Sequence, residues 1–238
     1  MTVYHFIDNR TGDGLCIIIP FRDKPNDIFS QGKGRTQNLR EWKQYMCTFL
    51  PKVGHSKSVV RIIEQTQDLP FNKGALFNIG AILEMDADCF IFHDVDHIPE
   101  RTSNTYTCQD DPVHMVTRTS QFGYKVVHQG SVGGALSMKR SFFKKINGYS
   151  TMFWGWGGED DNMRLRIGPH LHKLDATVGV YKALDHERVH GLDKTDLYNL
   201  HPSNDRASGT NTTIFTQMKE TVERCNDLMF IHTLVAIH

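Results

Sequence analysis

Apolar and polar positions form blocks that predict alternating strands and helices along the first part of the chain. Short apolar runs at residues 15–20, 59–65 and 89–92 are typical of buried strands. Between them, apolar side chains recur at helical spacing over residues 38–50 and 74–85. This order predicts an α/β fold with a mainly parallel central sheet flanked by helices.

The pattern changes in the second half. From about residue 131 onward the chain becomes glycine-rich and irregular, which we interpret as the ligand-facing half of the same domain. Residues 227–238 alternate between apolar and polar and predict a closing edge strand. We therefore expect residues 1–238 to form a single domain.

Charge and hydropathy exclude some partners. The chain has 27 Lys and Arg against 27 Asp and Glu, so no excess of positive charge indicates nucleic-acid binding. No apolar run reaches the roughly 18 residues of a membrane-spanning helix. The sequence therefore predicts no nucleic-acid partner and no membrane segment in this chain.

The five cysteines leave two alternatives open. They contain no Cys-x-x-Cys pair, which excludes the usual thiolate zinc site. Cys89 and Cys108 flank an acidic segment, and an oxidising compartment would allow a disulfide between them. In a reducing compartment the same residues would be buried thiols.

The most informative segment reads Phe-Trp-Gly-Trp-Gly-Gly-Glu-Asp-Asp at residues 153–161. Indole rings can cover a sugar while carboxylates accept hydrogen bonds from its hydroxyls, and glycines let the backbone approach the ligand. The alternative is a tight turn into an acidic helix N-terminus, where carboxylates complement the helix dipole. We favour a sugar-transfer site.

A second acidic motif, His-Asp-Val-Asp-His at residues 93–97, follows an apolar run. The period of an extended chain places Asp94 and Asp96 on one side. Open α/β sheets bind ligands beyond the carboxyl ends of their strands. Two carboxylates there suit a hard divalent cation that bridges to phosphate, Mn²⁺ or Mg²⁺ before Zn²⁺. A plain surface turn is the alternative for such a motif alone.

Six blocks of the chain resemble, in order, the catalytic domain of the beta-1,4-galactosyltransferase family, which is glycosyltransferase family seven. They lie at residues 18–22, 71–73, 92–99, 133–137, 146–149 and 154–161. The resemblance implies a GT-A (Rossmann-like) fold with a glycine-rich acceptor-side half. It also implies a UDP-sugar donor and a saccharide acceptor as partners, and Mn²⁺ as cofactor with Mg²⁺ as the alternative.

The resemblance assigns roles to particular positions. Asp160 matches the catalytic base, and Glu159 matches an acid that binds the acceptor at the catalytic centre. Asp96 and His186 match metal ligands. The positions that match acceptor-binding residues are His128, Trp156, Gly157, Gly158 and Glu159. Those that match donor-binding residues are Pro20, Phe21, Arg22, Phe71, Lys73, Asp94, Val95, Ser131, Gly133, Gly134, Trp156 and Asp161.

The implied reaction is a single in-line displacement that inverts the anomeric carbon. Asp160 takes the proton of the acceptor hydroxyl as that oxygen attacks, and a beta linkage results. A metal ion on Asp96 and His186 stabilises the departing UDP. Closure of the Trp156 loop excludes water.

Three departures from the family pattern bear on these roles. Lys73 stands where the family usually has Arg. Ala183 stands at a Met position and cannot ligate, and Arg188 replaces a second His, so the third protein ligand is open. Ser131 stands where galactose-using members place a bulky Tyr. The smaller side chain leaves room for an N-acetyl group, so the donor is open between UDP-galactose and UDP-GalNAc.

Cellular location and catalytic competence each have an alternative. Family members are usually Golgi-lumenal and anchored, whereas this chain begins about 15 residues before its first core strand. We therefore expect a soluble, cytoplasmic protein, with a trimmed Golgi-lumenal domain as the alternative. Cys89 and Cys108 match positions that are disulfide-bonded in the family. The alternative function is a catalytically inactive carbohydrate-binding relative; a glycoside hydrolase would need neither the metal motif nor a uridine pocket.

Overall fold

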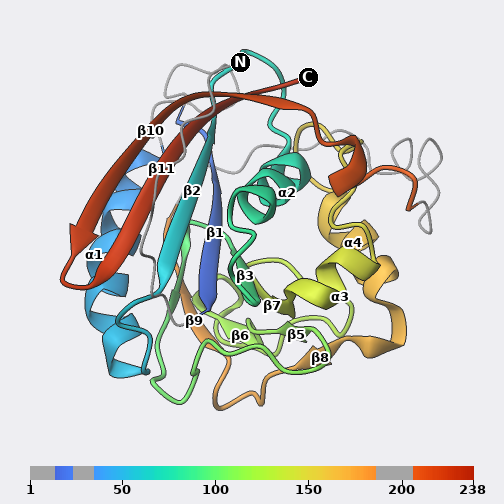
Figure 1. Cartoon of the computed structure of the whole chain (residues 1–238). Helices are drawn as coiled ribbons and strands as arrows, with labels where there is room; N and C mark the ends of the chain where they lie inside the picture. The colour runs from blue at the N-terminus through green and yellow to red at the C-terminus, as the bar shows by residue number, and fades with distance from the viewer. Residues whose placement is uncertain (1–13, 24–34, 186–205) are drawn as a thin grey trace.

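The computed structural model describes residues 14–23, 35–185 and 206–238, and it places them in a sheet with helices on both faces (Figure 1). The first half contains β1 (Leu15–Phe21), α1 (Thr36–Lys52), β2 (Val59–Gln65), α2 (Lys73–Leu83) and β3 (Cys89–His93). These five elements coincide, within a few residues at each end, with the strands and helices predicted from hydrophobic periodicity. Within the described residues, no helix is both long enough and apolar enough to cross a membrane.

The second half is built from shorter elements. They are β4 (His97–Pro99), β5 (Val113–His114), β6 (Arg118–Thr119), β7 (Ala135–Lys139), α3 (Arg140–Lys145), α4 (Glu159–Ile167), β8 (His172–Lys173), β9 (Val180–Ala183), β10 (Phe215–Cys225) and β11 (Leu228–Ile237). Several of these strands have only two residues, which is too short to give the sequence a regular pattern.

The main sheet has the strand order β10-β11-β2-β1-β3-β7-β5-β8. Its centre is parallel, as expected, because β1 pairs in parallel with both β2 and β3, and β11 pairs in parallel with β2. The pairs β3–β7, β7–β5 and β10–β11 are antiparallel. A separate small sheet has the order β4-β9-β6.

Two apolar layers cover the faces of the sheet. On β1, Ile17 and Ile19 join the cluster under α1, which contains Trp42 and Met46. Ile18 points to the other face and joins the cluster that includes α2. Because successive side chains of a strand alternate between faces, a strand buried on both faces must be apolar throughout, and β1 is. The layers fix the carboxyl ends of β1 and β3 at one edge of the core.

The C-terminal hairpin corrects one prediction. Residues 227–238 were expected to form the edge strand, but β11 lies inside the sheet, between β2 and β10. The edge position belongs to β10, whose side chains are exposed over almost its whole length. An exposed strand carries no apolar alternation, and this is why the sequence pattern missed it.

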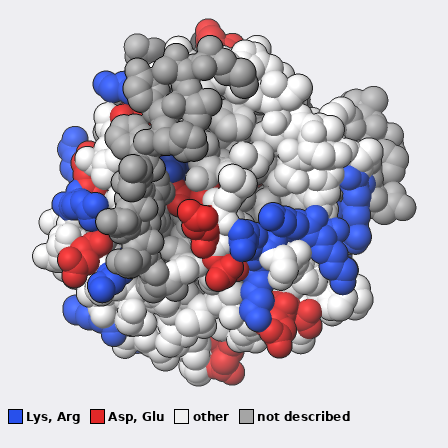
Figure 2. Space-filling model, in the orientation of Figure 1, with Lys and Arg blue, Asp and Glu red and all other residues white. Residues whose placement is uncertain are grey.

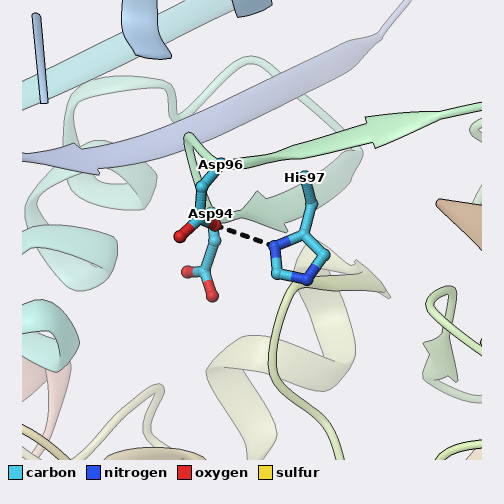
Figure 3. A group of neighbouring side chains, drawn as sticks. All are labelled: Asp94, Asp96 and His97. Atoms are coloured by element: carbon cyan, nitrogen blue, oxygen red, sulfur yellow. Dashed lines mark hydrogen bonds and ion pairs between the residues drawn. The ribbon is translucent and has the colours of Figure 1, made fainter. Parts of the chain in front are cut away.

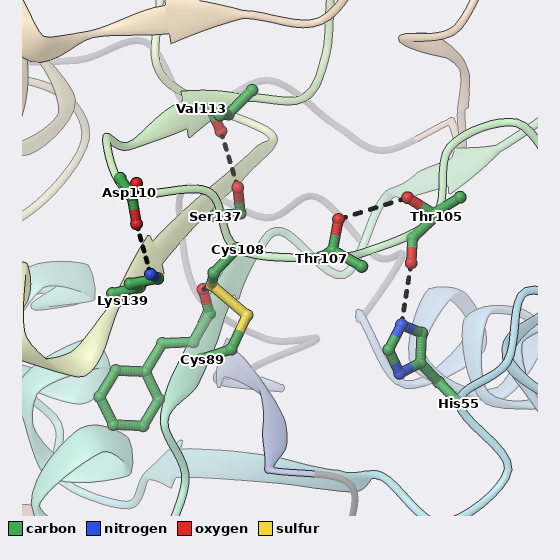
Figure 4. Close-up of a disulfide and its surroundings, with 10 residues drawn as sticks. His55, Cys89, Thr105, Thr107, Cys108, Asp110, Val113, Ser137 and Lys139 are labelled. Carbon is green, nitrogen blue, oxygen red and sulfur yellow. Dashed lines mark hydrogen bonds and ion pairs between the residues drawn. A yellow bond between two sulfur atoms is a disulfide. The ribbon is translucent and has the colours of Figure 1, made fainter.

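Two disulfides tie the core to its surroundings. Cys89 at the start of β3 bonds Cys108, with their Cα atoms 5.6 Å apart (Figure 4). This confirms the pairing that the family resemblance implied. A second disulfide, Cys47–Cys225, was not predicted; it joins α1 to the end of β10 across 178 residues of sequence. Together they fasten the sheet at two separate places.

Candidate active site

The acidic turn after β3 lies where the carboxyl end of that strand meets the start of β7. The Asp94 amide donates to the Gly134 carbonyl at 2.8 Å, and the Gly134 amide donates to Asp94 Oδ2 at 3.1 Å. Gly134 has φ +89°, and a Cβ there would lie 2.8 Å from Val116 Cγ2. Val95 is buried in the core. The turn is therefore fixed by two hydrogen bonds between Asp94 and Gly134, one of them to the Asp94 carboxylate, and the positive φ and the close contact favour glycine at position 134.

The second acidic motif forms the first turn of α4, which begins at Glu159 and carries Asp160 and Asp161 behind it. Carboxylates in this position complement the positive end of the helix dipole. Gly158 caps the helix with φ +94°, and a Cβ there would lie 2.5 Å from the Phe153 ring. The turn-and-helix interpretation of this segment is thus correct for its local structure, and it does not compete with the site interpretation.

One ammonium group joins the two acidic motifs. Lys73 is the first residue of α2, and its Nζ lies 3.1 Å from Asp94 Oδ1, 3.0 Å from Asp160 Oδ2 and 3.4 Å from Glu159 Oε1. Only 13% of the lysine side chain is exposed. Burial lowers the pKa of Lys73, but the three carboxylates outweigh it, and the net pKa lies well above its usual range. Lys73 is therefore charged at any physiological pH.

Asp160 is the carboxylate best placed to exchange a proton. Burial raises the pKa of Asp160 to about 7, against the lowering effect of Lys73. A general base works best when its pKa is near the operating pH. Gly133 keeps the space beside this carboxylate open, because a Cβ there would lie 2.7 Å from Asp160 Oδ2.

Glu159 has an unused hydrogen-bond acceptor. Its side chain is 9% exposed, and its Oε2 is buried with no hydrogen-bond partner in the described part of the chain. Buried carboxylate oxygens are normally satisfied, so an orphan of this kind indicates a missing donor. A ligand hydroxyl would supply that donor.

A possible cation site adjoins this cluster. Asp94, Asp96 and His97 each offer one ligand atom, and these atoms lie within 4.8 Å of one another (Figure 3). His97 Nδ1 lies 2.8 Å from Asp96 Oδ1, and Arg35 donates to Asp96 Oδ2 at 2.8 Å. Burial lowers the pKa of His97, but Asp96 outweighs it, so the net pKa is raised. Carboxylate and imidazole ligands fit Mn²⁺, and that ion would take over the charge balance that Arg35 now provides.

His97 was not among the predicted ligands, although it directly follows Asp96 in the quoted motif. The predicted ligand His186 lies outside the described residues. The last described stretch before it runs beside the metal motif: Ala183 pairs with His97 between β9 and β4, and the Leu184 amide donates to the Asp96 carbonyl at 2.7 Å. The turn that carries Asp96 thus lies beside the end of β9.

The predicted donor residues at the end of β1 lie next to the segment that precedes α2. Pro20 and Phe21 are buried, and the Arg22 guanidinium lies over the Phe71 ring at 5.5 Å from its centroid. The Phe71 carbonyl accepts a hydrogen bond from the Gly155 amide at 2.8 Å. This contact brings the tryptophan segment against the donor side.

The remaining predicted residues lie on two loops around the cluster. Trp156 is 57% exposed, and Gly157 and Asp161 are half-buried on either side of the helix start. On the other loop His128 is exposed, and its carbonyl accepts a hydrogen bond from the Ser131 amide at 3.0 Å. Within the described residues, no hydrogen bond or ion pair joins His128 or Ser131 directly to the carboxylates.

Comparison with known families gives matches over most of the chain. A model of the N-terminal region of glycosyl transferase group 7 matches residues 4–109. A model of the N-terminal domain of galactosyltransferase matches residues 113–190. The first matched range includes the acidic motif at residues 93–97, and the second includes the acidic motif at residues 159–161.

Several beta-1,4-galactosyltransferases are similar in sequence. Beta-1,4-galactosyltransferase 4 of Mus musculus is 42% identical over 194 residues, which are 79% of this chain and 53% of that protein. Beta-1,4-galactosyltransferase 5 of Homo sapiens is 40% identical over 178 residues, which are 72% of this chain and 43% of that protein. The chain spans about half the length of the curated relatives it matches.

Two solved structures share the fold. The catalytic domain of Drosophila beta1,4galactosyltransferase 7 in complex with xylobiose superposes with a TM-score of 0.77 at 21% identity, covering 94% of each chain. A mutant of that protein in complex with manganese, UDP-Gal and xylobiose gives 0.76 at 20% identity. The GT-A fold predicted from the sequence is therefore confirmed.

The shared ammonium of Lys73 should stabilise the folded protein. Replacing it in Lys73→Gln leaves the carboxylates of Asp94, Glu159 and Asp160 without their shared cation. We expect a loss of roughly 1–3 kcal/mol in the free energy of unfolding at pH 8. Burial already raises the pKa of Asp160 to about 7 and Lys73 limits that rise, so removing the cation raises the pKa of Asp160 further above its unfolded value, and stability returns as the pH falls toward 5. Urea unfolding at both pH values measures the difference.

The matched control is Lys57→Gln, because Lys57 is exposed and belongs to no part of this cluster. That variant should unfold like the unmodified protein at both pH values. A Lys73→Gln variant whose destabilisation is the same at pH 8 and pH 5 would contradict the electrostatic role assigned to the ammonium.

Proposed function

Because the chain belongs to glycosyltransferase family seven, the beta-1,4-galactosyltransferase family, we propose that it transfers galactose from UDP-galactose to a saccharide hydroxyl. The observation that carries the proposal is the Lys73 ammonium shared by the carboxylates of both acidic motifs. This ammonium brings Asp94, which belongs to the possible cation site, and the candidate base Asp160 into one site. The expected chemistry needs both.

The donor half of the site supplies charge and an aromatic surface. Arg22 and Phe71 lie together at the end of β1, where a nucleotide can stack and its phosphates can meet a cation. Asp94, Asp96 and His97 would hold Mn²⁺. When bound, the ion supplies positive charge that stabilises the departing diphosphate. Lys73 adds a permanent positive charge beside the same carboxylates.

The acceptor half supplies the base. The orphan Oε2 of Glu159 would accept a hydrogen bond from an acceptor hydroxyl and so orient the sugar. Asp160 would take the proton of the reacting hydroxyl while the oxygen of that hydroxyl bonds to the anomeric carbon of galactose. The bond from that carbon to UDP breaks, and UDP leaves with the electron pair. One displacement from the opposite face inverts the configuration and gives a beta linkage.

A catalytically inactive carbohydrate-binding relative is the second candidate. Its support is that Arg35 and Lys73 already balance the charges of Asp96 and Asp94, so the fold does not need a metal for charge balance. The same sugar-facing residues would then bind a saccharide without transfer. Metal-dependent turnover separates the two functions.

The disulfides bear on the compartment. Disulfides persist in oxidising surroundings and are rare in the cytosol of mesophiles. The pairs Cys89–Cys108 and Cys47–Cys225 therefore favour work in an oxidising compartment, such as the Golgi-lumenal alternative, over the cytoplasmic location that the sequence suggested.

The base makes a prediction about rate. Asp160→Asn keeps the shape of the side chain but cannot accept the proton, so kcat should fall by roughly 10²–10⁴-fold. Release of UDP from UDP-galactose, in the presence of Mn²⁺ and a saccharide panel, measures the rate. EDTA should abolish it.

Asp86→Asn is the matched control, because Asp86 is an exposed aspartate outside the site. It should keep the full rate. If Asp160→Asn retained a rate within a few-fold of the unmodified enzyme, Asp160 would not be the base.

Position 131 makes a prediction about the donor. Ser131 is half-buried and its side chain is much smaller than tyrosine, so we expect the unmodified enzyme to accept UDP-GalNAc beside UDP-galactose. Ser131→Tyr should lower kcat/KM for UDP-GalNAc by at least tenfold relative to UDP-galactose, because the N-acetyl group would meet the ring. The ratio of kcat/KM for the two donors is the measurement. An unchanged ratio would show that position 131 does not select the donor.

A further inference from the structure

Arg164 is a cation near the site that the proposed transfer chemistry does not use. It stands four residues after Asp160 on α4, so the two side chains lie on the same face of that helix, one turn apart. Among the described residues no ion pair to Arg164 occurs. Its half-buried guanidinium, which no carboxylate of the described ranges pairs with, could bind an anionic ligand.

A glycine-containing loop lies along this face of α4. A Cβ on Gly133 would lie 2.7 Å from Asp160 Oδ2, while a Cβ on Gly130 would lie 3.2 Å from Arg164 Cδ and 3.3 Å from its Nε. The loop thus contacts the candidate base at one end and the guanidinium at the other. The separation of one helical turn, about 5.4 Å along the axis, is close to the width of a single sugar ring.

A second cation contacts the same loop. Lys173, in β8, donates from Nζ to the His128 carbonyl at 2.6 Å, and a Cβ on Gly130 would lie 3.4 Å from His128 Nδ1. The loop at residues 128–130 thus contacts Lys173 through His128 and Arg164 through Gly130. Burial lowers the pKa of Lys173, which indicates a partly desolvated amine that would gain from a nearby anion.

Lys173 lies away from the residues proposed for the nucleotide. In the main sheet β8 is separated from β1 by β3, β7 and β5, and the residues proposed for the nucleotide follow β1. Figure 2 shows Lys and Arg side chains gathered next to Asp and Glu side chains, in the region where Figure 1 labels α3 and α4. The donor phosphates have their own cations in Arg22 and Lys73.

We propose that Arg164 and Lys173 form an anion subsite, and that the acceptor is an acidic saccharide whose carboxylate, sulfate or phosphate group binds there. The proposal rests on the proposed transferase function and names the substrate class of the same site. A hydroxyl of the acceptor ring would meet Asp160 while the anionic group of that ring or its neighbour meets the guanidinium. Charge-assisted contacts of this kind are stronger than neutral ones.

The test compares a neutral disaccharide acceptor with the same disaccharide carrying a carboxylate, a sulfate or a phosphate. In the unmodified enzyme kcat/KM should be about 10–100-fold higher for at least one anionic acceptor, since a hydrogen bond to a charged group contributes roughly 1.5–3 kcal/mol. The three anionic arms identify which group is used. The preference should shrink as NaCl is raised.

Variants assign the preference to the subsite. Arg164→Gln and Lys173→Gln should each reduce the ratio of anionic to neutral kcat/KM about tenfold, mainly through the KM of the anionic acceptor. The matched control is Lys144→Gln, an exposed lysine on α3, which should keep the ratio. A ratio near one in the unmodified enzyme, or an equal ratio in the Arg164 and Lys173 variants, would overturn the proposal.

Failure of the transferase function is distinguishable from failure of the subsite. If no acceptor is turned over, binding of the anionic and neutral disaccharides is measured directly by calorimetry. Binding of an anionic disaccharide that weakens about tenfold in Arg164→Gln supports the subsite in a binding protein. Equal binding by the unmodified protein and the variant overturns it.

Discussion

The site depends on the single ammonium group of Lys73. Three carboxylates converge on it from two distant motifs, the turn after β3 and the first turn of α4. Without a cation, like charges at this separation would repel one another in a partly buried setting. Because Lys73 starts α2, whose apolar face packs on β1, the position of the ammonium is fixed by the core. The hydrophobic layers therefore determine where the acids can meet.

The same arrangement sets the properties of Asp160. Burial raises the pKa of Asp160, and the positive charge of Lys73 limits the rise, so this pKa is about 7. Gly133 leaves room at the carboxylate, and Gly134 fixes the turn that carries Asp94. A base that is desolvated, held by a permanent charge and open on one side is suited to remove a proton from a bound hydroxyl.

Sequence reasoning succeeded where side chains are buried on regular elements. β1, β2 and β3 and the helices between them have apolar patterns that follow from packing. It gave α4 only as an alternative interpretation of the acidic segment, because Glu159–Ile167 has no apolar face, and it missed β10, because an exposed edge strand needs none. The Cys47–Cys225 bridge spans 178 residues, and spacing alone cannot give such connectivity. Arg164 became visible only when the fold placed the 128–134 loop along α4.

The stereochemistry of the product tests the central claim most directly. The enzyme would be incubated with UDP-galactose, Mn²⁺ and an anionic or neutral saccharide, and the new linkage would be assigned by NMR from the anomeric proton coupling. A single displacement with Asp160 as base predicts a beta-linked galactoside from the alpha-linked donor. An alpha-linked product, or release of free galactose in place of transfer, would contradict the account.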